Sequence, residues 1–215
     1  MEIRLNHYTK VIGKKTILSD INLSFQSGEI VGLQGINGSG KTMLLRALCG
    51  LIYPTEGSLE IDGKVMGKDF SFPESVGALI ESPAFLKEYT GKKNLEMIAA
   101  LRGVASKEDI AFAMKRIGLE PDDKRTYKKY SLGMKQKLGI AAAIMEKPDL
   151  IILDEPFNAL DESSAKACQE IIMEEKNRGA LVFLACHDKT VLSGLSDVLY
   201  SIEEGKITDY RRKEE

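Results

Sequence analysis

The sequence predicts an α/β fold: a core with a mixed, mainly parallel sheet, an antiparallel β-subdomain at the N-terminus, and a helical subdomain. In the last third of the chain, unbroken apolar segments of strand length alternate with helical segments. That alternation is typical of a parallel sheet covered on both faces. The first part of the chain instead holds short alternating segments and tight turns, which predict antiparallel strands.

The N-terminal elements are strands around one helix. Residues 2–5 (EIRL) and 17–25 (ILSDINLSF) place apolar side chains at every second position, as half-buried strands do. Residues 57–66 (GSLEIDGKVM) predict a hairpin around their Asp-Gly pair. Residues 41–50 (KTMLLRALCG) have helical spacing and end in glycine, a typical helix stop.

The middle of the chain carries no strand pattern. Within residues 91–119, apolar side chains recur at steps of three and four, which predicts amphipathic helices. We therefore expect a helical subdomain over about residues 86–147. The remaining core would comprise residues 1–85 and 148–215, so that residues 1–215 form a single domain, as their number allows.

The last third supplies the alternation that defines the core. Residues 149–155 (DLIILDE) and 180–187 (ALVFLACH) predict buried strands, and residues 131–146 and 161–179 predict helices. Residues 197–207 predict a closing hairpin. In such sheets ligands bind beyond the carboxyl ends of the strands, so the residues just after each strand are the candidates for function.

Composition narrows the class of protein. The chain is 43% hydrophobic and has a formal net charge of −2, which disfavours nucleic acid as a partner because nucleic-acid binders usually carry a basic excess. The three cysteines, Cys49, Cys168 and Cys186, are too far apart for a CxxC pair and are expected to be reduced. Cys168 lies in a polar helical segment and is a candidate for an exposed thiol. No signal peptide or membrane span is predicted, so any action at a membrane would need a partner.

A phosphate-binding loop is the strongest motif. Residues 35–42, GINGSGKT, fit the pattern G-x-x-x-x-G-K-[ST] between a strand and a helix. The glycines let successive backbone N–H groups surround an anion, and the following helix adds its positive end. Lys41 can reach the β- and γ-phosphates, and the Thr42 hydroxyl can bind magnesium. An ordinary glycine-rich turn is the alternative; the Lys-Thr pair in register disfavours it. The pattern predicts a P-loop nucleoside triphosphatase (NTPase) core.

Three polar side chains follow other predicted strands. Asp154 and Glu155 directly follow the four apolar residues LIIL, residues 150–153. Asp154 suits a water-mediated magnesium contact, and Glu155 can orient and deprotonate an attacking water. Alternatively, the pair merely ends the strand. His187 follows the next strand, where it can donate a hydrogen bond to a γ-phosphate, whereas the second histidine, His7, is expected to be structural or exposed.

Glu81 raises a separate question. It stops the apolar run VGALI and precedes Ser82 and Pro83, which force a turn. It is either the polar exit of a buried strand or a carboxylate placed to meet a ligand. Its position after a predicted strand favours the second interpretation, a carboxylate placed to meet a ligand.

With these residues placed, the sequence resembles the nucleotide-binding domain of ABC transporters over nearly its whole length. YSLGMKQKLGIAAAI, from Tyr130, stands where that family carries its Leu-Ser-Gly-Gly-Gln signature. NALD, residues 158–161, resembles the D-loop, and His187 resembles the switch histidine. The resemblance implies that two ATPase subunits pack head to tail around two ATP molecules, with Mg²⁺ as cofactor. We expect the two subunits to be copies of this chain, which would make a homodimer. It also implies a polytopic membrane permease as partner and a cytoplasmic location on the inner face of the membrane.

The resemblance assigns roles to individual residues. Glu155 would be the catalytic base, with His187 and Glu81 as further catalytic residues. Magnesium would be held by Thr42, Glu81 and Asp154. The residues expected to bind ATP are Gly35, Ile36, Asn37, Gly38, Ser39, Gly40, Lys41, Thr42, Met43 and Ile12. The residues expected to contact the ATP of the partner chain are Ser131, Leu132, Gly133, Met134 and Asp161.

Three departures from the family pattern refine the prediction. Met134 replaces the second glycine of the signature, and Lys135 intervenes before its glutamine, as in the ATPases of the bacitracin- and lantibiotic-export subgroup. Ile12 stands where the family often has an aromatic residue on the adenine; apolar contact or an approach of Tyr8 would have to replace stacking. Glu81 stands at the position of the Q-loop glutamine, again as in that subgroup.

The resemblance predicts the ATPase subunit of a bacterial exporter of a peptide antibiotic or similar compound. The alternative is a soluble ABC-type ATPase that acts in iron–sulfur assembly or regulation without transport.

Overall fold

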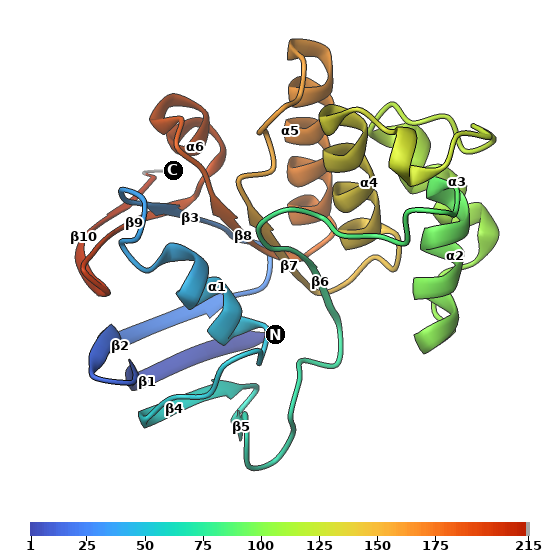
Figure 1. Ribbon diagram of the computed structural model, residues 1–215. Helices are drawn as coiled ribbons and strands as arrows, with labels where there is room; N and C mark the ends of the chain where they lie inside the picture. The colour runs from blue at the N-terminus through green and yellow to red at the C-terminus, as the bar shows by residue number, and fades with distance from the viewer. Residues whose placement is uncertain (214–215) are drawn as a thin grey trace.

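The computed structural model describes residues 1–213, which form two sheets and a group of helices (Figure 1). The smaller sheet is antiparallel, with strand order β2-β1-β4-β5. Its strands are β1 (Glu2–Ile12), β2 (Lys15–Gln26), β4 (Glu56–Ile61) and β5 (Lys64–Val65). The α/β fold with an N-terminal antiparallel sheet is confirmed.

The larger sheet has the strand order β10-β9-β3-β8-β7-β6. Its strands are β3 (Ile30–Gln34), β6 (Val76–Leu79), β7 (Leu150–Asp154), β8 (Leu181–Ala185), β9 (Val198–Glu203) and β10 (Lys206–Arg212). All neighbours pair in parallel except β10, which is antiparallel to β9. The sheet is therefore mixed, as predicted.

The helices fall on both sides of the larger sheet. They are α1 (Lys41–Leu48), α2 (Gly91–Arg102), α3 (Lys107–Arg116), α4 (Leu132–Ile144), α5 (Glu162–Asn177) and α6 (Lys189–Leu195), with a 3₁₀ turn at Tyr127–Lys129. Helix α1 lies between the two sheets, whereas α4 and α5 cover the opposite face of the larger sheet (Figure 1).

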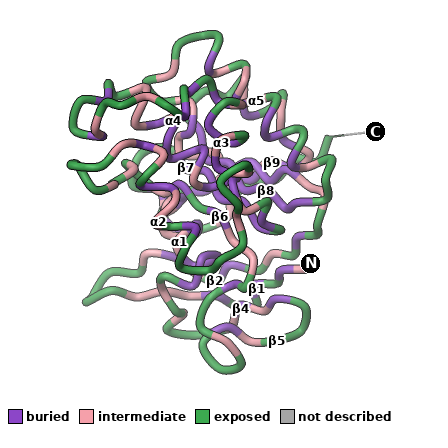
Figure 2. The backbone as a smooth tube through the Cα atoms, turned by 90° about the vertical axis from the view of Figure 1, so that its right-hand side faces the viewer, coloured by how far each residue is buried: buried purple, intermediate pink, exposed green. Residues whose placement is uncertain are grey.

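Strand β7 explains why the larger sheet needs cover on both faces. Leu150 and Ile152 belong to the core that α1 shares with the smaller sheet, and Ile151 and Leu153 belong to the core under α4 and α5. All four side chains are at most 1% exposed. A strand buried on both faces reads as a continuous apolar run, which is the pattern in the sequence. Figure 2 shows the buried strands at the centre of the molecule.

Two expectations about single residues are wrong. Cys168 is fully buried because it lies on the α5 face that packs on the sheet, and burial raises the pKa of its thiol to about 12. Tyr8 is also fully buried, and its hydroxyl donates to the Ile52 carbonyl oxygen at 3.1 Å. Strand β1 is much longer than the predicted residues 2–5, and its extension carries Tyr8 into the core.

The parallel register brings the carboxyl ends of four strands to one edge. Leu33 of β3 pairs with Ala185 of β8, which also pairs with Asp154 of β7, and Leu153 pairs with Leu79 of β6. The segments that follow these strands are the predicted phosphate loop, the Asp154-Glu155 pair, His187 and Glu81. The topology therefore places the predicted functional segments together.

Candidate functional site

The phosphate loop runs directly into helix α1. Gly40 is the N-cap of α1 with φ of 116°, a conformation that favours glycine, and within residues 1–213 no side chain caps this helix end. The first N–H groups of α1 are thus available to an anion. Lys41 is only 6% exposed, and its ammonium donates to the carbonyl oxygens of Gly35 at 2.7 Å and Ile36 at 3.1 Å. Its charge is held inside the loop.

Thr42 and Asp154 join the loop to strand β7. The Thr42 hydroxyl donates to Asp154 Oδ2 at 2.7 Å, and Asp154 is only 5% exposed. Hydroxyl and carboxylate oxygens are the ligands that magnesium prefers. Within residues 1–213 no three His, Cys, Asp or Glu side chains cluster closely enough to hold a metal by themselves. The pair fits a magnesium ion that takes its remaining ligands from phosphate and water, the usual arrangement for this ion.

Glu155 and His187 form a pair between the ends of β7 and β8. His187 Nε2 lies 3.0 Å from Glu155 Oε1, and the His187 backbone N–H donates to Oε2 at 3.3 Å. Burial raises the pKa of the Glu155 carboxyl, and the charge of His187 opposes part of that shift. A fixed carboxylate with a raised pKa is a better proton acceptor than an ordinary exposed one.

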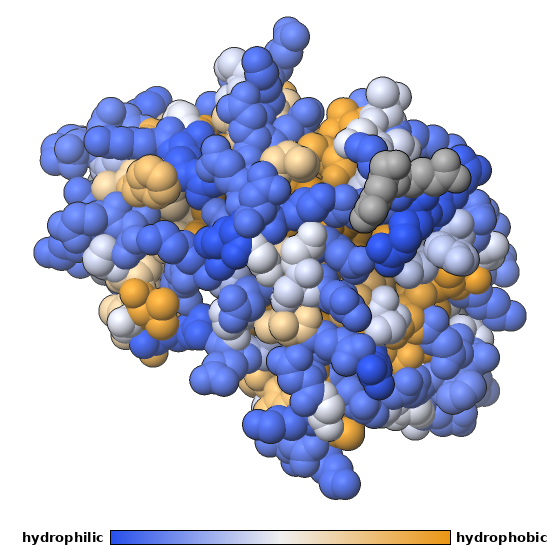
Figure 3. All heavy atoms as spheres, turned by 180° about the vertical axis from the view of Figure 1, so that it is seen from behind, coloured by the Kyte–Doolittle hydropathy of each residue, from blue (hydrophilic) through white to orange (hydrophobic). Residues whose placement is uncertain are grey.

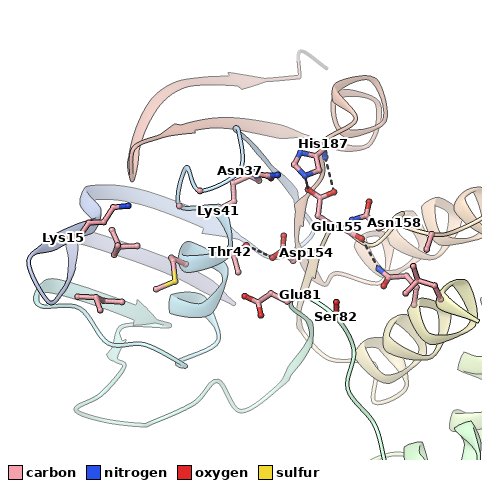
Figure 4. Close-up of a pocket in the computed structure, with 18 residues that line it drawn as sticks. Lys15, Asn37, Lys41, Thr42, Glu81, Ser82, Asp154, Glu155, Asn158 and His187 are labelled. Atoms are coloured by element: carbon pink, nitrogen blue, oxygen red, sulfur yellow. Dashed lines mark hydrogen bonds and ion pairs between the residues drawn. The ribbon is translucent and has the colours of Figure 1, made fainter. Parts of the chain in front are cut away.

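Glu81 turns back toward helix α1. Its φ of 60° is unusual for a residue with a side chain, and its carboxylate accepts a hydrogen bond from Arg46 of α1 at 2.8 Å. The side chain lies below the Thr42–Asp154 pair (Figure 4). Of the two interpretations of Glu81, the structure favours a carboxylate that faces the site over a polar strand exit.

These groups surround one open cavity of about 770 Å³, which is within the range of small-molecule sites. Figure 4 shows Lys41, Thr42, Asp154 and Glu155 converging on it. The predicted residues that line it are Ile12, Asn37, Gly38, Gly40, Lys41, Thr42, Met43, Glu81, Leu132, Asp154, Glu155 and His187.

The other predicted residues lie outside this lining. Gly35 and Ile36 border a neighbouring cavity of about 600 Å³, and Ser39 is buried within the loop. The signature and D-loop residues Ser131, Gly133, Met134 and Asp161 do not line the cavity of their own chain. Asp161 is the N-cap of α5, where hydrogen bonds from Ser164 and Ser163 lower its pKa to about 2.

The signature forms the N-terminus of α4. The Ser131 hydroxyl accepts from the Met134 N–H at 3.2 Å and caps the helix, and Leu132 is 72% exposed. Met134 is partly buried and packs against the core. Gln136 donates from Nε2 to the Glu155 backbone carbonyl oxygen at 3.0 Å, which connects α4 to the segment that follows β7.

Gly133 lies against the D-loop. A Cβ at this position would be 2.7 Å from the Ala159 carbonyl oxygen. We expect Gly133→Ala to destabilise the protein by about 1–3 kcal/mol, because either α4 or the D-loop must shift. The matched control is Gly194→Ala, also on a helix, where a Cβ meets nothing within 4 Å. Urea unfolding of the two variants gives the comparison, and an equally stable Gly133→Ala protein would contradict the close contact.

Several residues that line the cavity were not predicted to do so. Lys15, Ile17 and Ser82 had no predicted role, whereas Gln136, Asn158 and Ala159 lie in the predicted signature and D-loop segments but were not expected to line this cavity. Lys15 and Ile17 lie just beyond the turn after Ile12 on the neighbouring strand. Gln136 was visible in the signature segment, but nothing in the sequence indicated its bond to the Glu155 backbone.

A phosphate loop, a Thr–Asp pair and a half-buried carboxylate, all at the carboxyl ends of parallel strands, define a P-loop NTPase. The comparisons specify the family. The family model described as "ABC transporter" matches residues 18–158, so the chain belongs to the ABC transporter family. It is an ATP-binding, ATP-hydrolysing subunit of that family, as predicted.

The most informative relatives carry names of the same kind. The chain is 45% identical to the uncharacterized ABC transporter ATP-binding protein YybJ of Bacillus subtilis, over 95% of this chain and 94% of that protein. It is 35% identical to the bacitracin transport ATP-binding protein BcrA of Enterococcus faecalis, over 96% of this chain and 68% of that protein. It is 34% identical to the lantibiotic transport ATP-binding protein SrtF of Streptococcus pyogenes, over 95% of this chain and 88% of that protein. The predicted likeness to this subgroup is confirmed.

The fold also matches solved structures. One described as "Structure of ATP binding subunit of ABC transporter" superposes with a TM-score of 0.89 at 25% identity, over 99% of this chain and 90% of that chain. The comparisons favour the transporter interpretation over a soluble ATPase of iron–sulfur assembly.

Proposed function

We propose that this chain hydrolyses ATP with Glu155 as general base and that this drives a membrane exporter. The observation that carries the proposal is the convergence of Lys41, Thr42, Asp154 and Glu155 on one cavity (Figure 4). Lys41 and the α1 N-terminus bind the phosphates. Glu155, held by His187, takes a proton from the attacking water.

Magnesium, when bound, would neutralise phosphate charge and orient the phosphates. Thr42 and Asp154 would hold it, directly or through water, with Glu81 completing the set. The Thr42–Asp154 hydrogen bond of 2.7 Å supports this, since it already brings both oxygens to one point beside the loop.

The second half of each site is proposed to come from another copy of the chain, packed head to tail. Helix α4 supports this role because its N-terminus is exposed at Ser131 and Leu132, where it can face the γ-phosphate held by a partner. Residues 1–215 would act as one ATPase domain within that dimer.

The membrane permease is the second proposed partner. Within residues 1–213 no helix is both long and apolar enough to span a bilayer. A groove of about 390 Å³ lies between β6, the loop after Glu81 and helices α2 and α4. Its rim includes Leu101, which is 84% exposed, and Ile98, which is 38% exposed. Seen from behind, the surface is mostly hydrophilic with several apolar patches, one of which is small and lies on the side of α2 (Figure 3). We assign this groove to a cytoplasmic segment of the permease.

Leu101→Glu is expected to abolish co-purification with the permease, because it places a charge on the apolar rim. The ATPase rate of the isolated subunit should stay unchanged, since Leu101 is remote from the cavity lining. Phe112→Glu is the matched control: Phe112 is 57% exposed on α3 and does not line the groove. Equal recovery of permease with both variants would place the docking surface elsewhere. Failure of the unaltered chain to co-purify with any polytopic membrane protein would contradict the transporter role.

A peptide antibiotic or a similar compound is the proposed cargo, exported from the cytoplasm. This rests on the similarity to a bacitracin and a lantibiotic transport ATP-binding protein. The subunit would lie on the inner face of the cell membrane, held there by the permease.

The adenine end of the cavity is aliphatic. Ile12, which is 50% exposed, lines it together with Lys15, Ile17 and Met43, and within residues 1–213 no Phe or Tyr does. Ile12→Phe should therefore tighten ATP binding by about tenfold, since stacking of a base on an aromatic ring contributes about 1–3 kcal/mol. Titration with a fluorescent ATP analogue measures the gain. Ile12→Leu serves as the control, and identical affinities for the Phe and Leu variants would show that the base does not sit on residue 12.

A further inference from the structure

An ion pair links the phosphate-binding helix to Glu81. Arg46 lies four residues after Thr42 on α1, so the two side chains share one face of the helix. Its Nη2 donates to Glu81 Oε1 at 2.8 Å. Within residues 1–213 neither side chain has another side-chain partner for a hydrogen bond or ion pair. The pair therefore connects the helix that holds the phosphates to the loop proposed to contact the permease.

The backbone at Glu81 is shaped for this contact. Its φ of 60° lies in the left-handed region, which residues with side chains rarely adopt. Strand β6 ends at Leu79, and this turn directs the carboxylate back toward α1 instead of along the strand. Figure 4 shows the carboxylate beside α1, below Thr42 and Asp154. Unusual backbone held in this way points to a functional constraint.

The Arg46–Glu81 ion pair reduces the negative charge of the cavity. Three carboxylates, those of Glu81, Asp154 and Glu155, line the cavity that receives a polyphosphate. Of these, Glu81 is the most exposed, at 60% for its side chain. An unpaired Glu81 would repel the phosphates until magnesium arrives. The guanidinium of Arg46 cancels that charge at a distance of 2.8 Å.

We propose that Arg46 is a positioning residue for Glu81. It holds and neutralises the carboxylate while magnesium is absent, and it releases the carboxylate to the metal when magnesium and ATP are bound. The pair is weak enough for such an exchange, because the Arg46 side chain is 36% exposed and exposed ion pairs contribute little. The inference rests on the proposed magnesium role of Glu81. A purely structural pair that fastens the loop to α1 is the competing explanation.

The test is a double-mutant cycle of Arg46→Gln and Glu81→Gln, read by binding of fluorescent ATP in EDTA. Arg46→Gln should weaken metal-free ATP binding by roughly five- to tenfold, a coupling typical of charged neighbours. In the Glu81→Gln background the same substitution should have little effect, since no carboxylate remains to be neutralised. Arg46→Lys should restore most of the affinity. An equal loss in both backgrounds would overturn the proposal, because Arg46 would then act on the phosphates directly.

Magnesium titration of ATP binding separates this inference from the role of Glu81. Glu81→Gln should raise the magnesium concentration needed for half-saturation, and Arg46→Gln should lower it several-fold by freeing the carboxylate. An unchanged titration for Glu81→Gln would refute the role of Glu81 itself. A shift for Glu81→Gln without one for Arg46→Gln would refute only the positioning role. Thermal melting of all four proteins should give similar midpoints, and a large drop for Arg46→Gln would support the structural explanation instead.

Discussion

Glu155→Gln is expected to slow ATP turnover by roughly 10²–10⁴-fold, the usual contribution of a general base, while ATP remains bound. The amide has nearly the same shape as the carboxylate and can still accept the hydrogen bond from the His187 backbone N–H, which spans 3.3 Å in the native pair. It cannot accept a proton from water. Because burial raises the pKa of Glu155, the native residue is also a stronger base than an exposed glutamate.

A single-turnover measurement of ATP hydrolysis detects this loss, and equilibrium binding shows whether ATP is retained. Glu170→Gln on the exposed face of α5 is the matched control and should hydrolyse ATP at the normal rate. If Glu155→Gln kept more than a tenth of the turnover, another group would have to be the base.

Lys41→Ala should weaken ATP binding by about a hundredfold. Truncating one partner of a buried charge pair costs about 2–5 kcal/mol, and tenfold in affinity corresponds to 1.4 kcal/mol. Lys41 is only 6% exposed and also donates to the carbonyl oxygens of Gly35 and Ile36, so its loss removes both the phosphate contact and a brace of the loop.

Calorimetric titration with ATP measures the Lys41→Ala effect, and Lys15→Ala is the control within the same cavity. Lys15 lines the far end of the cavity and is exposed, so its removal should change the affinity by no more than a few fold. Comparable losses for the two variants would mean that general positive charge, and not the loop lysine, binds the nucleotide.

Much of the fold was predictable because its signals are local. The phosphate loop is one contiguous segment, and the apolar runs of β7 and β8 reveal their burial on both faces directly. The parallel register then follows from the alternation of strands and helices, and it places Asp154 and His187 at the same edge. No long-range contact had to be known.

The missing parts depend on contacts between distant segments. The Arg46–Glu81 pair joins residues 35 positions apart and depends on the rotation of α1 and on the backbone turn at Glu81. The predicted contact of Gly133 with a partner's phosphate remains a prediction, and its closeness to the Ala159 carbonyl oxygen could not be foreseen because it depends on how α4 packs against the D-loop. Cys168 was a candidate for an exposed thiol because its neighbours in the sequence are polar. The sequence alone did not show that Cys168 lies on the buried face of α5.

In the proposed mechanism, ATP joins two copies of this chain around a shared site. Light scattering of the Glu155→Gln protein, with and without saturating ATP and magnesium, measures whether this dimer forms. We expect a monomer without nucleotide and twice that mass with ATP, because the variant site binds ATP but cannot hydrolyse it. A protein that binds ATP and stays monomeric at saturation would contradict the head-to-tail dimer.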